Sequence, residues 1–227
     1  MLAIGVDEHG YRRVLGCQLG HAEDFHHWRS FLRRLVERGL RGVELVTSDA
    51  HAGLVRALRQ VLGGVVWQRC QTHFRRNVTQ AAPAHQRDAL HEALDEILNA
   101  DSKEEARARV NEVLERLEGR CDKALECLEQ GWEDACAILS WPSKYRKRLR
   151  TTNMVERCNE ELRRRDKVIR IYPNMASVYR TLGARLLEMD EAWSTGKRYL
   201  KMQAYEDWKR RQETSSQQDE LMDAAAE

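Results

Sequence analysis

Residues 43–70, VELVTSDAHAGLVRALRQVLGGVVWQRC, decide the fold class, because they have the pattern of a strand, a helix and a second strand. The segment VELVTSD is short and mostly apolar, as is typical of a strand buried on both faces. A helix is predicted from about residue 52 to residue 62, and residues 65–70 form the next strand. Strands that alternate with helices predict a mixed α/β sheet.

The residues before this stretch predict a hairpin followed by a helix. Residues 2–6, LAIGV, and residues 11–20 have the composition of strands, and DEHG between them is a turn in which Gly10 tolerates a positive φ. Residues 23–38 have the apolar spacing of an amphipathic helix, which Gly39 closes. The chain is therefore expected to begin inside a sheet.

The residues after this stretch change to helices only. An insertion is predicted over residues 83–139, with helices at 84–99, 102–117 and 122–139, the last broken near Gly131. Ser102 is the expected N-cap of the second helix and Glu105 completes a capping box. Further helices are predicted at 174–193, with Asn174 as N-cap, and at 197–212. The polar residues from 213 onward are expected to fray.

The charges of the chain are segregated, although the net charge is only +2. Residues 144–170 carry 11 Lys and Arg against 4 Asp and Glu, whereas residues 84–134 carry 7 against 15. A basic stripe predicts a polyanionic partner, and the acidic stretch predicts a spacer or a protein contact.

The cysteines and the hydropathy exclude two classes of protein. Six cysteines are scattered without a Cys-x-x-Cys pair or a signal peptide, which predicts reduced thiols and a cytoplasmic protein. No stretch approaches 18 continuous apolar residues, so no transmembrane helix is predicted and membrane functions are excluded.

Residues 150–165, RTTNMVERCNEELRRR, predict a strongly basic helix in which one face holds both a carboxylate and guanidinium groups. Asn153 is a suitable N-cap, and Glu156, Asn159 and Arg163 recur on one side of the helix. Glu156 falls in the first turn, where the helix dipole favours a charged carboxylate, the ligand that Mg²⁺ prefers. The alternative interpretation is a solvated helix held by salt bridges.

Asp49 ends the predicted strand at residues 43–49, the position at which open α/β sheets bind their ligands. Two or three carboxylates that converge in a basic site are typical of two-metal phosphoryl transfer. We therefore expect the carboxyl carbons of Asp49 and Glu156 to lie within about 10 Å of each other, since paired metals are roughly 4 Å apart. Taken alone, Asp49 has the pattern of a cap or turn residue.

Cys70 and His73 have half the spacing of a zinc site, but no second pair stands at a matching distance. We interpret them as a free cysteine at a strand end and a histidine that forms hydrogen bonds near the site. The remaining histidines, among them His21, are interpreted as surface or cap residues.

Four segments in their order along the chain resemble the Mutator-type transposases of bacterial insertion sequences. The resemblance covers roughly residues 3–193. The segments are SDAHAGL (48–54), WQRCQTHFRRN (67–77), RTTNMVERCNEELRRR (150–165) and IYPNMAS (171–177), with the helical insertion between the second and the third.

The resemblance implies an RNase H-like fold with an Asp, Asp, Glu triad that uses Mg²⁺ or Mn²⁺. Asp49 corresponds to the second Asp and Glu156 to the Glu, and both are the implied metal ligands. Cys70 and His73 correspond to the Cys-x-x-His element of the family. By resemblance, such an enzyme cuts DNA at the ends of the element and joins 3′-OH groups to target DNA.

The sequence departs from the family pattern at the first Asp, whose strand would precede residues 2–6. Asp7 is not a substitute, because it falls in the predicted hairpin turn. The missing strand would be central in the sheet, and the N-terminal DNA-binding region of the family is also absent. The resemblance therefore implies an N-terminally truncated and inactive fragment. A non-catalytic DNA-binding or interaction fragment of a transposase is the alternative.

These predictions divide the chain into three parts and give it one class of partner. Residues 1–82 and 140–195 would form the catalytic domain, residues 83–139 the helical insertion, and residues 196–227 a C-terminal helix and tail. DNA is the predicted partner, bound by a homo-oligomer associated with the nucleoid. The predicted DNA-binding residues are Arg75, Arg76, Arg150, Arg157, Arg163, Arg164 and Arg165, and the predicted supporting residues are Cys70, His73, Asn153 and Asn159.

Overall fold

A computed structural model describes residues 1–20, 22–169 and 171–225, and the predictions for His21 and Arg170 fall outside these ranges. The chain forms two compact units. The first unit comprises Met1–Ala3 and Leu15–Tyr172, and the second comprises Ile4–Val14 and Pro173–Glu227. No described helix is long and apolar enough to cross a membrane.

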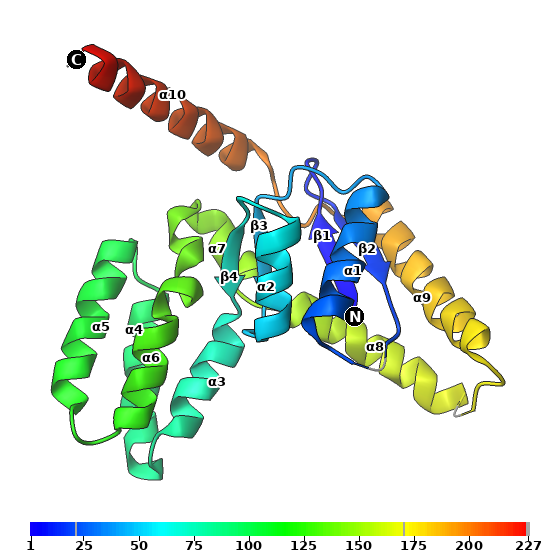
Figure 1. The fold of residues 1–227 in the computed structure, drawn as a ribbon, viewed down its shortest axis with the longest axis horizontal. Coiled ribbons are helices and arrows are strands. Elements are labelled where there is room, and N and C mark those ends of the chain that lie inside the picture. The colour runs from blue at the N-terminus through cyan, green and yellow to red at the C-terminus, as the bar shows by residue number, and fades with distance from the viewer. Residues whose placement is uncertain (21, 170, 226–227) are drawn as a thin grey trace. The chain divides into compact units, whose positions relative to one another are not determined.

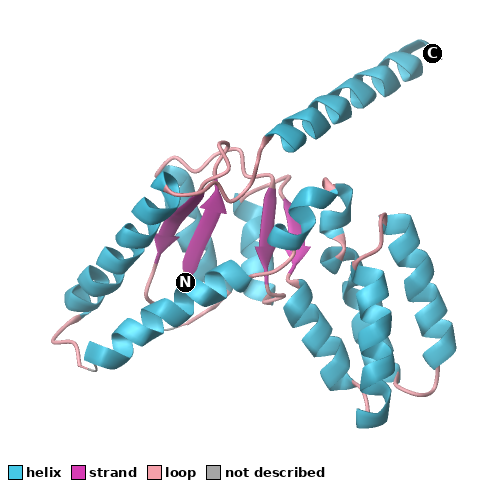
Figure 2. Cartoon of the chain, turned by 180° about the vertical axis from the view of Figure 1, so that it is seen from behind, coloured by secondary structure: helices cyan, strands magenta, loops and turns pink. Residues whose placement is uncertain are grey.

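The strands form two separate two-stranded sheets (Figure 2). The strands are β1 (Leu2–Val6), β2 (Arg12–Cys17), β3 (Leu45–Ser48) and β4 (Val66–Arg69). Strands β3 and β4 run parallel, with Leu45 opposite Val66 and Ser48 opposite Arg69. The predicted mixed α/β class is confirmed, whereas a continuous RNase H-like sheet stays a prediction.

Two helices of the first unit pack on each other, and Val46 of β3 and Trp67 of β4 pack against their shared apolar cluster. They are α1 (Phe25–Glu37) and α2 (Ala52–Val61). Gly39 has a φ of 105°, and its N–H donates to Val36 O while Leu40 N–H donates to Leu35 O. This pair of bonds ends α1 and confirms the predicted closing glycine.

Four helices run side by side, one that leads into the predicted insertion and three that lie within it (Figure 1). They are α3 (Gln71–Ala81), α4 (Arg87–Leu98), α5 (Lys103–Leu117) and α6 (Asp122–Ala135), with short 3-10 turns η1 (Ala84–Gln86) and η2 (Ala137–Ser140). Their apolar faces bury one continuous core in which Leu90, Leu94 and Leu128 are inaccessible to solvent. The amphipathic pattern of the sequence therefore correctly predicts the helices.

The predicted break near Gly131 is wrong, because α6 is continuous from Asp122 to Ala135. A Cβ atom at Gly131 would lie 2.3 Å from Arg69 Nη1 and 2.8 Å from Phe74 Cε2. The glycine therefore allows α6 to approach its neighbours closely, which sequence alone cannot distinguish from a helix break.

The predicted capping box at the start of α5 is confirmed in one of its two bonds. Ser102 Oγ accepts from Glu105 N at 3.1 Å. The Glu105 carboxylate accepts from Asp101 N at 2.8 Å, one residue before the position that a capping box requires.

Helices α7 (Ser143–Leu149) and α8 (Asn153–Ile169) complete the first unit. Helix α8 includes Asn153, and Glu156 N–H donates to Thr152 O at 3.0 Å. The predicted N-cap is therefore wrong by one position, because Thr152 carries the first carbonyl acceptor of the helix.

The second unit contains the tip of the hairpin and the helices α9 (Met175–Thr195) and α10 (Gln203–Ala225). Asn174 accepts from Ser177 N, which confirms the predicted cap of α9. Helix α10 starts after the predicted residue 197 and continues through the residues expected to fray, which are rich in the helix formers Glu, Gln and Ala.

Gly10 has two functions in the second unit. Its φ of 84° confirms the predicted turn residue. Its carbonyl accepts from the N–H groups of Tyr199 and Leu200, and a Cβ atom would lie 2.0 Å from Leu200 O. The hairpin tip therefore requires glycine for close packing as well as for conformation.

Candidate active site

A short segment, residues 149–152, is held at the carboxyl ends of β3 and β4. The hydroxyl of Thr47, in β3, donates to Leu149 O at 2.5 Å. Gln71 N–H, at the start of α3, donates to Arg150 O at 3.0 Å. These two bonds fix the segment that leads into α8, and so they fix where the first turn of that helix begins.

Cys70 and Thr152 connect the strand ends to Glu156. Cys70 N–H donates to Ser48 O at 2.7 Å, which extends the parallel pairing past the end of β4. Thr152 N–H donates to Cys70 Sγ at 3.3 Å, and Thr152 Oγ1 lies 3.2 Å from the same sulfur and 2.8 Å from Glu156 Oε1. A hydroxyl has one proton, so Thr152 donates to the thiol sulfur or to the carboxylate but not to both at once.

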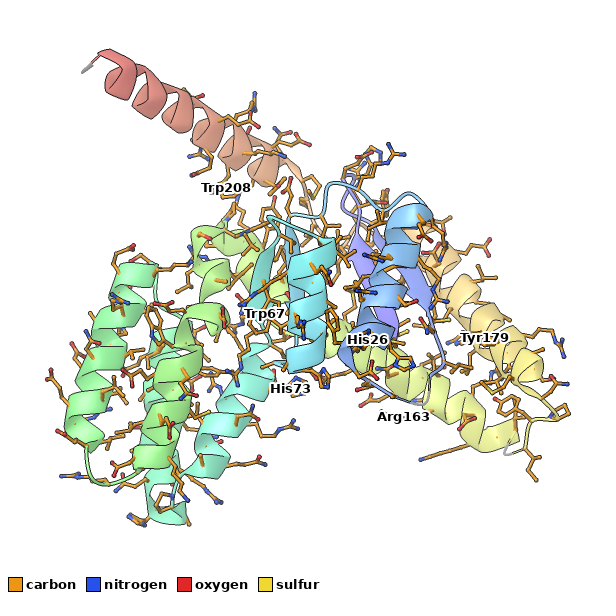
Figure 3. The ribbon with its side chains drawn as sticks, in the orientation of Figure 1. His26, Trp67, His73, Arg163, Tyr179 and Trp208 are labelled. Carbon is orange, nitrogen blue, oxygen red and sulfur yellow. The ribbon has the colours of Figure 1, made fainter. Side chains whose placement is uncertain are left out.

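His73 faces Glu156 from helix α3 and is labelled in Figure 3. Its Nε2 lies 3.6 Å from Glu156 Oε1, while the side chains of His73 and Glu156 are 24% and 44% exposed. Cys70 is fully buried. One ligand atom from each of Cys70, His73 and Glu156 lies within 4.8 Å of the other two, so these residues could hold a metal ion.

Asp49 follows Ser48 directly, at the end of β3, and is exposed. Its Oδ1 accepts from His51 N at 3.4 Å, and His51 in turn caps α2 by accepting from Leu54 N. Within the described residues Asp49 is not a member of the group formed by Cys70, His73 and Glu156. The predicted approach of Asp49 to Glu156 stays a prediction, although the strand that ends at Ser48 is bonded to Cys70.

Asp7 has the position that its turn sequence predicts. Its Oδ1 accepts from His9 N at 3.0 Å and from Tyr11 N at 2.8 Å, so this carboxylate closes the hairpin turn. The interpretation of Asp7 as a turn residue is confirmed.

The predicted DNA-binding arginines fall into two groups. Arg75 and Arg150 are half-buried and contact the helical insertion, Arg75 through Asp95 at 2.5 Å and Arg150 through Asn99 Oδ1 at 2.7 Å. The exposed arginines are Arg76, Arg157, Arg163, Arg164 and Arg165. Figure 3 labels Arg163, which extends from α8. The exposed group is open to solvent, whereas Arg75 and Arg150 join the strand side to the insertion, and DNA binding by either group stays a prediction.

Burial affects the charge of Arg150. Burial lowers the pKa of Arg150, and the nearby positive charge of Arg75 lowers it further, while Asp95 opposes both effects. The ion pair with Asp95 and the hydrogen bond to Asn99 therefore offset the cost of placing two half-buried positive charges close together.

The predicted supporting residues lie on α8, where Asn153 is exposed and Asn159 is half-buried. Sequence reasoning missed Thr152 and the buried amides of Gln68 and Gln71. Both amides donate to Ala135 O, at 2.7 and 2.9 Å, and Gln68 Oε1 accepts from Ile138 N at 2.7 Å. A glutamine in an otherwise apolar strand, as in VVWQRC, is the signal that could have indicated a buried hydrogen-bond network.

Comparison with known proteins gives consistent results. The sequence profile of the Mutator family of transposases matches residues 1–196. The chain is 40% identical over 200 residues to the transposase for insertion sequence element IS1081 of Mycobacterium tuberculosis, which is 88% of this chain and 48% of that protein. It is 40% identical over 201 residues to the transposase for IS406 of Burkholderia multivorans, covering 88% of this chain and 52% of that protein.

A third relative is the transposase for IS256 in transposon Tn4001 of Staphylococcus aureus, which is 38% identical over 194 residues, covering 85% of this chain and 50% of that protein. The chain spans about half the length of the curated relatives it matches. Since the family profile covers nearly all of the chain and several relatives share well over a third of their aligned residues with it, the chain belongs to the Mutator family of transposases.

Proposed function

We propose that this chain is part of the catalytic domain of an insertion-sequence transposase that cuts and joins DNA with Mg²⁺ or Mn²⁺. The observation that carries the proposal is the set of bonds at the strand ends. Cys70 links Ser48, the neighbour of Asp49, to Thr152, and Thr152 reaches Glu156. Residues far apart in the sequence are thereby gathered at one edge, where α/β sheets bind ligands.

In this proposal, Asp49 and Glu156 are the metal ligands. Their carboxylates are the hard oxygen donors that Mg²⁺ prefers, and both are accessible to solvent. When bound, paired divalent ions activate the attacking oxygen and stabilise the leaving oxygen of a phosphodiester exchange. Thr152 holds the Glu156 carboxylate in place through its hydroxyl, and His73 adds a second contact to the same oxygen.

A third carboxylate is expected to complete the site from outside these 227 residues. Two carboxylates would supply few oxygen ligands for a pair of divalent ions, and the Asp7 carboxylate already accepts two hydrogen bonds in its turn. We propose that a further strand carrying this Asp pairs with the strands of the first unit and completes an RNase H-like sheet. The chain by itself would then be inactive.

A Mg²⁺-dependent strand-transfer assay tests this proposal. The substrate is a pre-cut element end with a 3′-OH, and the 227-residue chain is compared with a protein extended upstream by a strand carrying the family Asp. Activity is expected only in the extended protein, and Asp49→Ala and Glu156→Ala should each abolish it. Turnover by the 227-residue chain that is lost in Asp49→Ala would disprove the missing-carboxylate argument.

The proposed DNA-binding surface consists of the exposed arginines of α8. Substituting Arg163, Arg164 and Arg165 by Glu should flatten the log–log dependence of DNA affinity on salt by up to about 3 units, since each phosphate contact contributes about 0.9. The triple substitution of Arg107, Arg116 and Arg120 by Glu, all in or next to α5, is the matched control, and it should leave the slope unchanged.

The alternative function is a DNA-binding or interaction fragment without catalysis, which would act on full-length copies as a homo-oligomer on DNA. The exposed basic face of α8 favours DNA binding in either case. The strand-transfer assay distinguishes the two functions. An extended protein that binds DNA with the expected salt dependence but never joins it would support the alternative.

A further inference from the structure

We propose that Cys70, His73 and Glu156 form a binding site for a thiophilic divalent cation such as Zn²⁺. Two elements bring the three side chains together, because Cys70 and His73 stand at the start of α3 and Glu156 stands in the first turn of α8. Their ligand atoms all lie within 4.8 Å of one another. This inference concerns metal binding by the chain itself and does not require DNA strand transfer. Glu156 is also the carboxylate that the proposed function assigns to Mg²⁺, so the two kinds of ion would compete for it.

The distances are close to those of a tetrahedral zinc site. Bond lengths of about 2.3 Å to sulfur and about 2.0–2.1 Å to nitrogen or oxygen place tetrahedral ligands roughly 3.3–3.8 Å apart. His73 Nε2 and Glu156 Oε1, at 3.6 Å, already satisfy this range. The sulfur needs to approach the other two ligand atoms by about 1.5 Å at most, which rotations of the partly exposed His73 and Glu156 side chains allow.

The two ring nitrogens of His73 give a second indication. His73 Nδ1 is buried and has no hydrogen-bond partner within the described residues. The other ring nitrogen, Nε2, lies 3.6 Å from Glu156 Oε1, which is longer than a hydrogen bond and matches the separation of two ligand atoms on one metal ion. A neutral ring that donates its Nε2–H to Glu156 is the alternative.

The ligand set selects the metal. A thiolate and an imidazole suit Zn²⁺ and Co²⁺, whereas Mg²⁺ takes oxygen ligands. Three protein ligands leave one position open to solvent, on the side where Glu156 is exposed. Binding would convert the Cys70 thiol to a thiolate and release its proton, and Thr152 N–H, already directed at the sulfur, would stabilise the negative charge.

Titration of the 227-residue chain with CoCl₂, followed by absorption spectroscopy, tests the site. We expect one equivalent of Co²⁺ to give a sulfur-to-cobalt charge-transfer band in the near ultraviolet. Equimolar ZnCl₂ should remove the band, and a large excess of MgCl₂ should not. Cys70→Ser should abolish the band, while His73→Gln and Glu156→Gln should each weaken Co²⁺ binding by more than about 100-fold, beyond the effect of losing an outer-shell partner.

Matched cysteine variants make the assignment specific. Cys17→Ser and Cys127→Ser remove half-buried thiols outside the group and should retain the full band and affinity. Circular dichroism establishes that each variant is folded, and if Cys70→Ser is not folded, the His73 and Glu156 variants decide. The absence of a charge-transfer band, or unchanged affinity in Glu156→Gln and His73→Gln, would overturn the proposal. Since no DNA is present, failure here would leave the strand-transfer proposal intact.

Discussion

The first unit contains two hydrophobic cores that differ in how completely they close. The core of the helical insertion, which includes Leu90, Leu94 and Leu128, is sealed from solvent. The core between α1, α2 and the strands has six buried residues, all from the two helices, while Val46 and Trp67 of the strands are only partly buried. The backbone N–H and C=O groups of a helix form hydrogen bonds within the helix. Each described strand, in contrast, pairs with one other strand and so has one edge without a strand partner. The insertion is therefore the more self-contained part.

The comparison explains where the chemistry-bearing residues lie. Cys70 follows the last strand and precedes the first helix of the insertion side, at the border between the two cores. Gln68 and Gln71 bind that border to Ala135 at the end of α6. The core of the helical insertion thus anchors the strand ends. We expect substitutions in the insertion to lower the free energy of unfolding more than comparable substitutions on the strand side.

The largest effect is expected when a leucine is truncated to alanine in each of the two cores. Leu94→Ala, at a site inaccessible to solvent in α4, should lower the free energy of unfolding by about 4–5 kcal/mol. Leu54→Ala, at an 8% exposed site in α2, should cost about 2–3 kcal/mol, because the thinner core relaxes into the cavity. Urea denaturation measures both values. Equal losses would remove the distinction between the two cores.

Glycine substitutions test how tightly the insertion packs. Gly131→Ala should cost about 1–3 kcal/mol, because the added methyl group meets Arg69 and Phe74. Gly183→Ala in α9 is the matched control, since nothing lies within 4 Å of its added Cβ. It should be neutral or raise stability by up to about 1 kcal/mol through helix propensity. A stabilising Gly131→Ala would show that α6 can move away from its neighbours.

Buried hydrogen bonds give a smaller contrast. Gln68→Leu removes the acceptor of Ile138 N at the buried border of the insertion core and should cost about 1–3 kcal/mol. Thr47→Val removes the bond to Leu149 O on the half-buried strand side and should cost about 0.5–1.5 kcal/mol. Thermal unfolding of the two variants measures both effects, and a larger loss in Thr47→Val would reverse the ranking.

The smallest effect is a dependence on pH that comes from Cys136 in the insertion core. Burial raises the pKa of Cys136 from 9.0 to about 12. The folded state therefore keeps the proton between pH 9 and pH 12 while the unfolded state loses it. The free energy of unfolding is therefore highest below pH 9 and falls as pH rises above 9, by at most about 1.4 kcal/mol per pH unit. Cys136→Ala should flatten this decline between pH 9 and 10 in urea titrations, and an identical slope would contradict the assignment.

The sequence predicts the elements whose signals are local. The strand, helix, strand pattern of residues 43–70, the helical insertion, and the caps at Asn174 and Gly39 all occur in the structure. Each of these depends on neighbours within a few residues, such as alternating apolar positions or a glycine with a positive φ.

Features that depend on distant residues were predicted less well. Gly131 has the pattern of a helix break, and only the proximity of Arg69 and Phe74 shows that it permits close packing. Similarly, Cys70 and His73 lack a second local ligand pair, while the third member of their group, Glu156, comes from another helix. Local spacing cannot reveal a ligand that the fold brings from elsewhere in the chain.

The complete burial of Cys70 also makes its sulfur a natural reporter of motion. Thr152 contacts this thiol, so movement of residues 149–152 away from the strand ends would expose it to a small alkylating reagent. In a chain whose other cysteines are replaced, and with enough reagent for alkylation to outpace reclosing, the labelling rate of Cys70 would equal the rate of such openings. A slow labelling rate would mean that residues 149–152, and with them the start of α8, rarely separate from the strand ends.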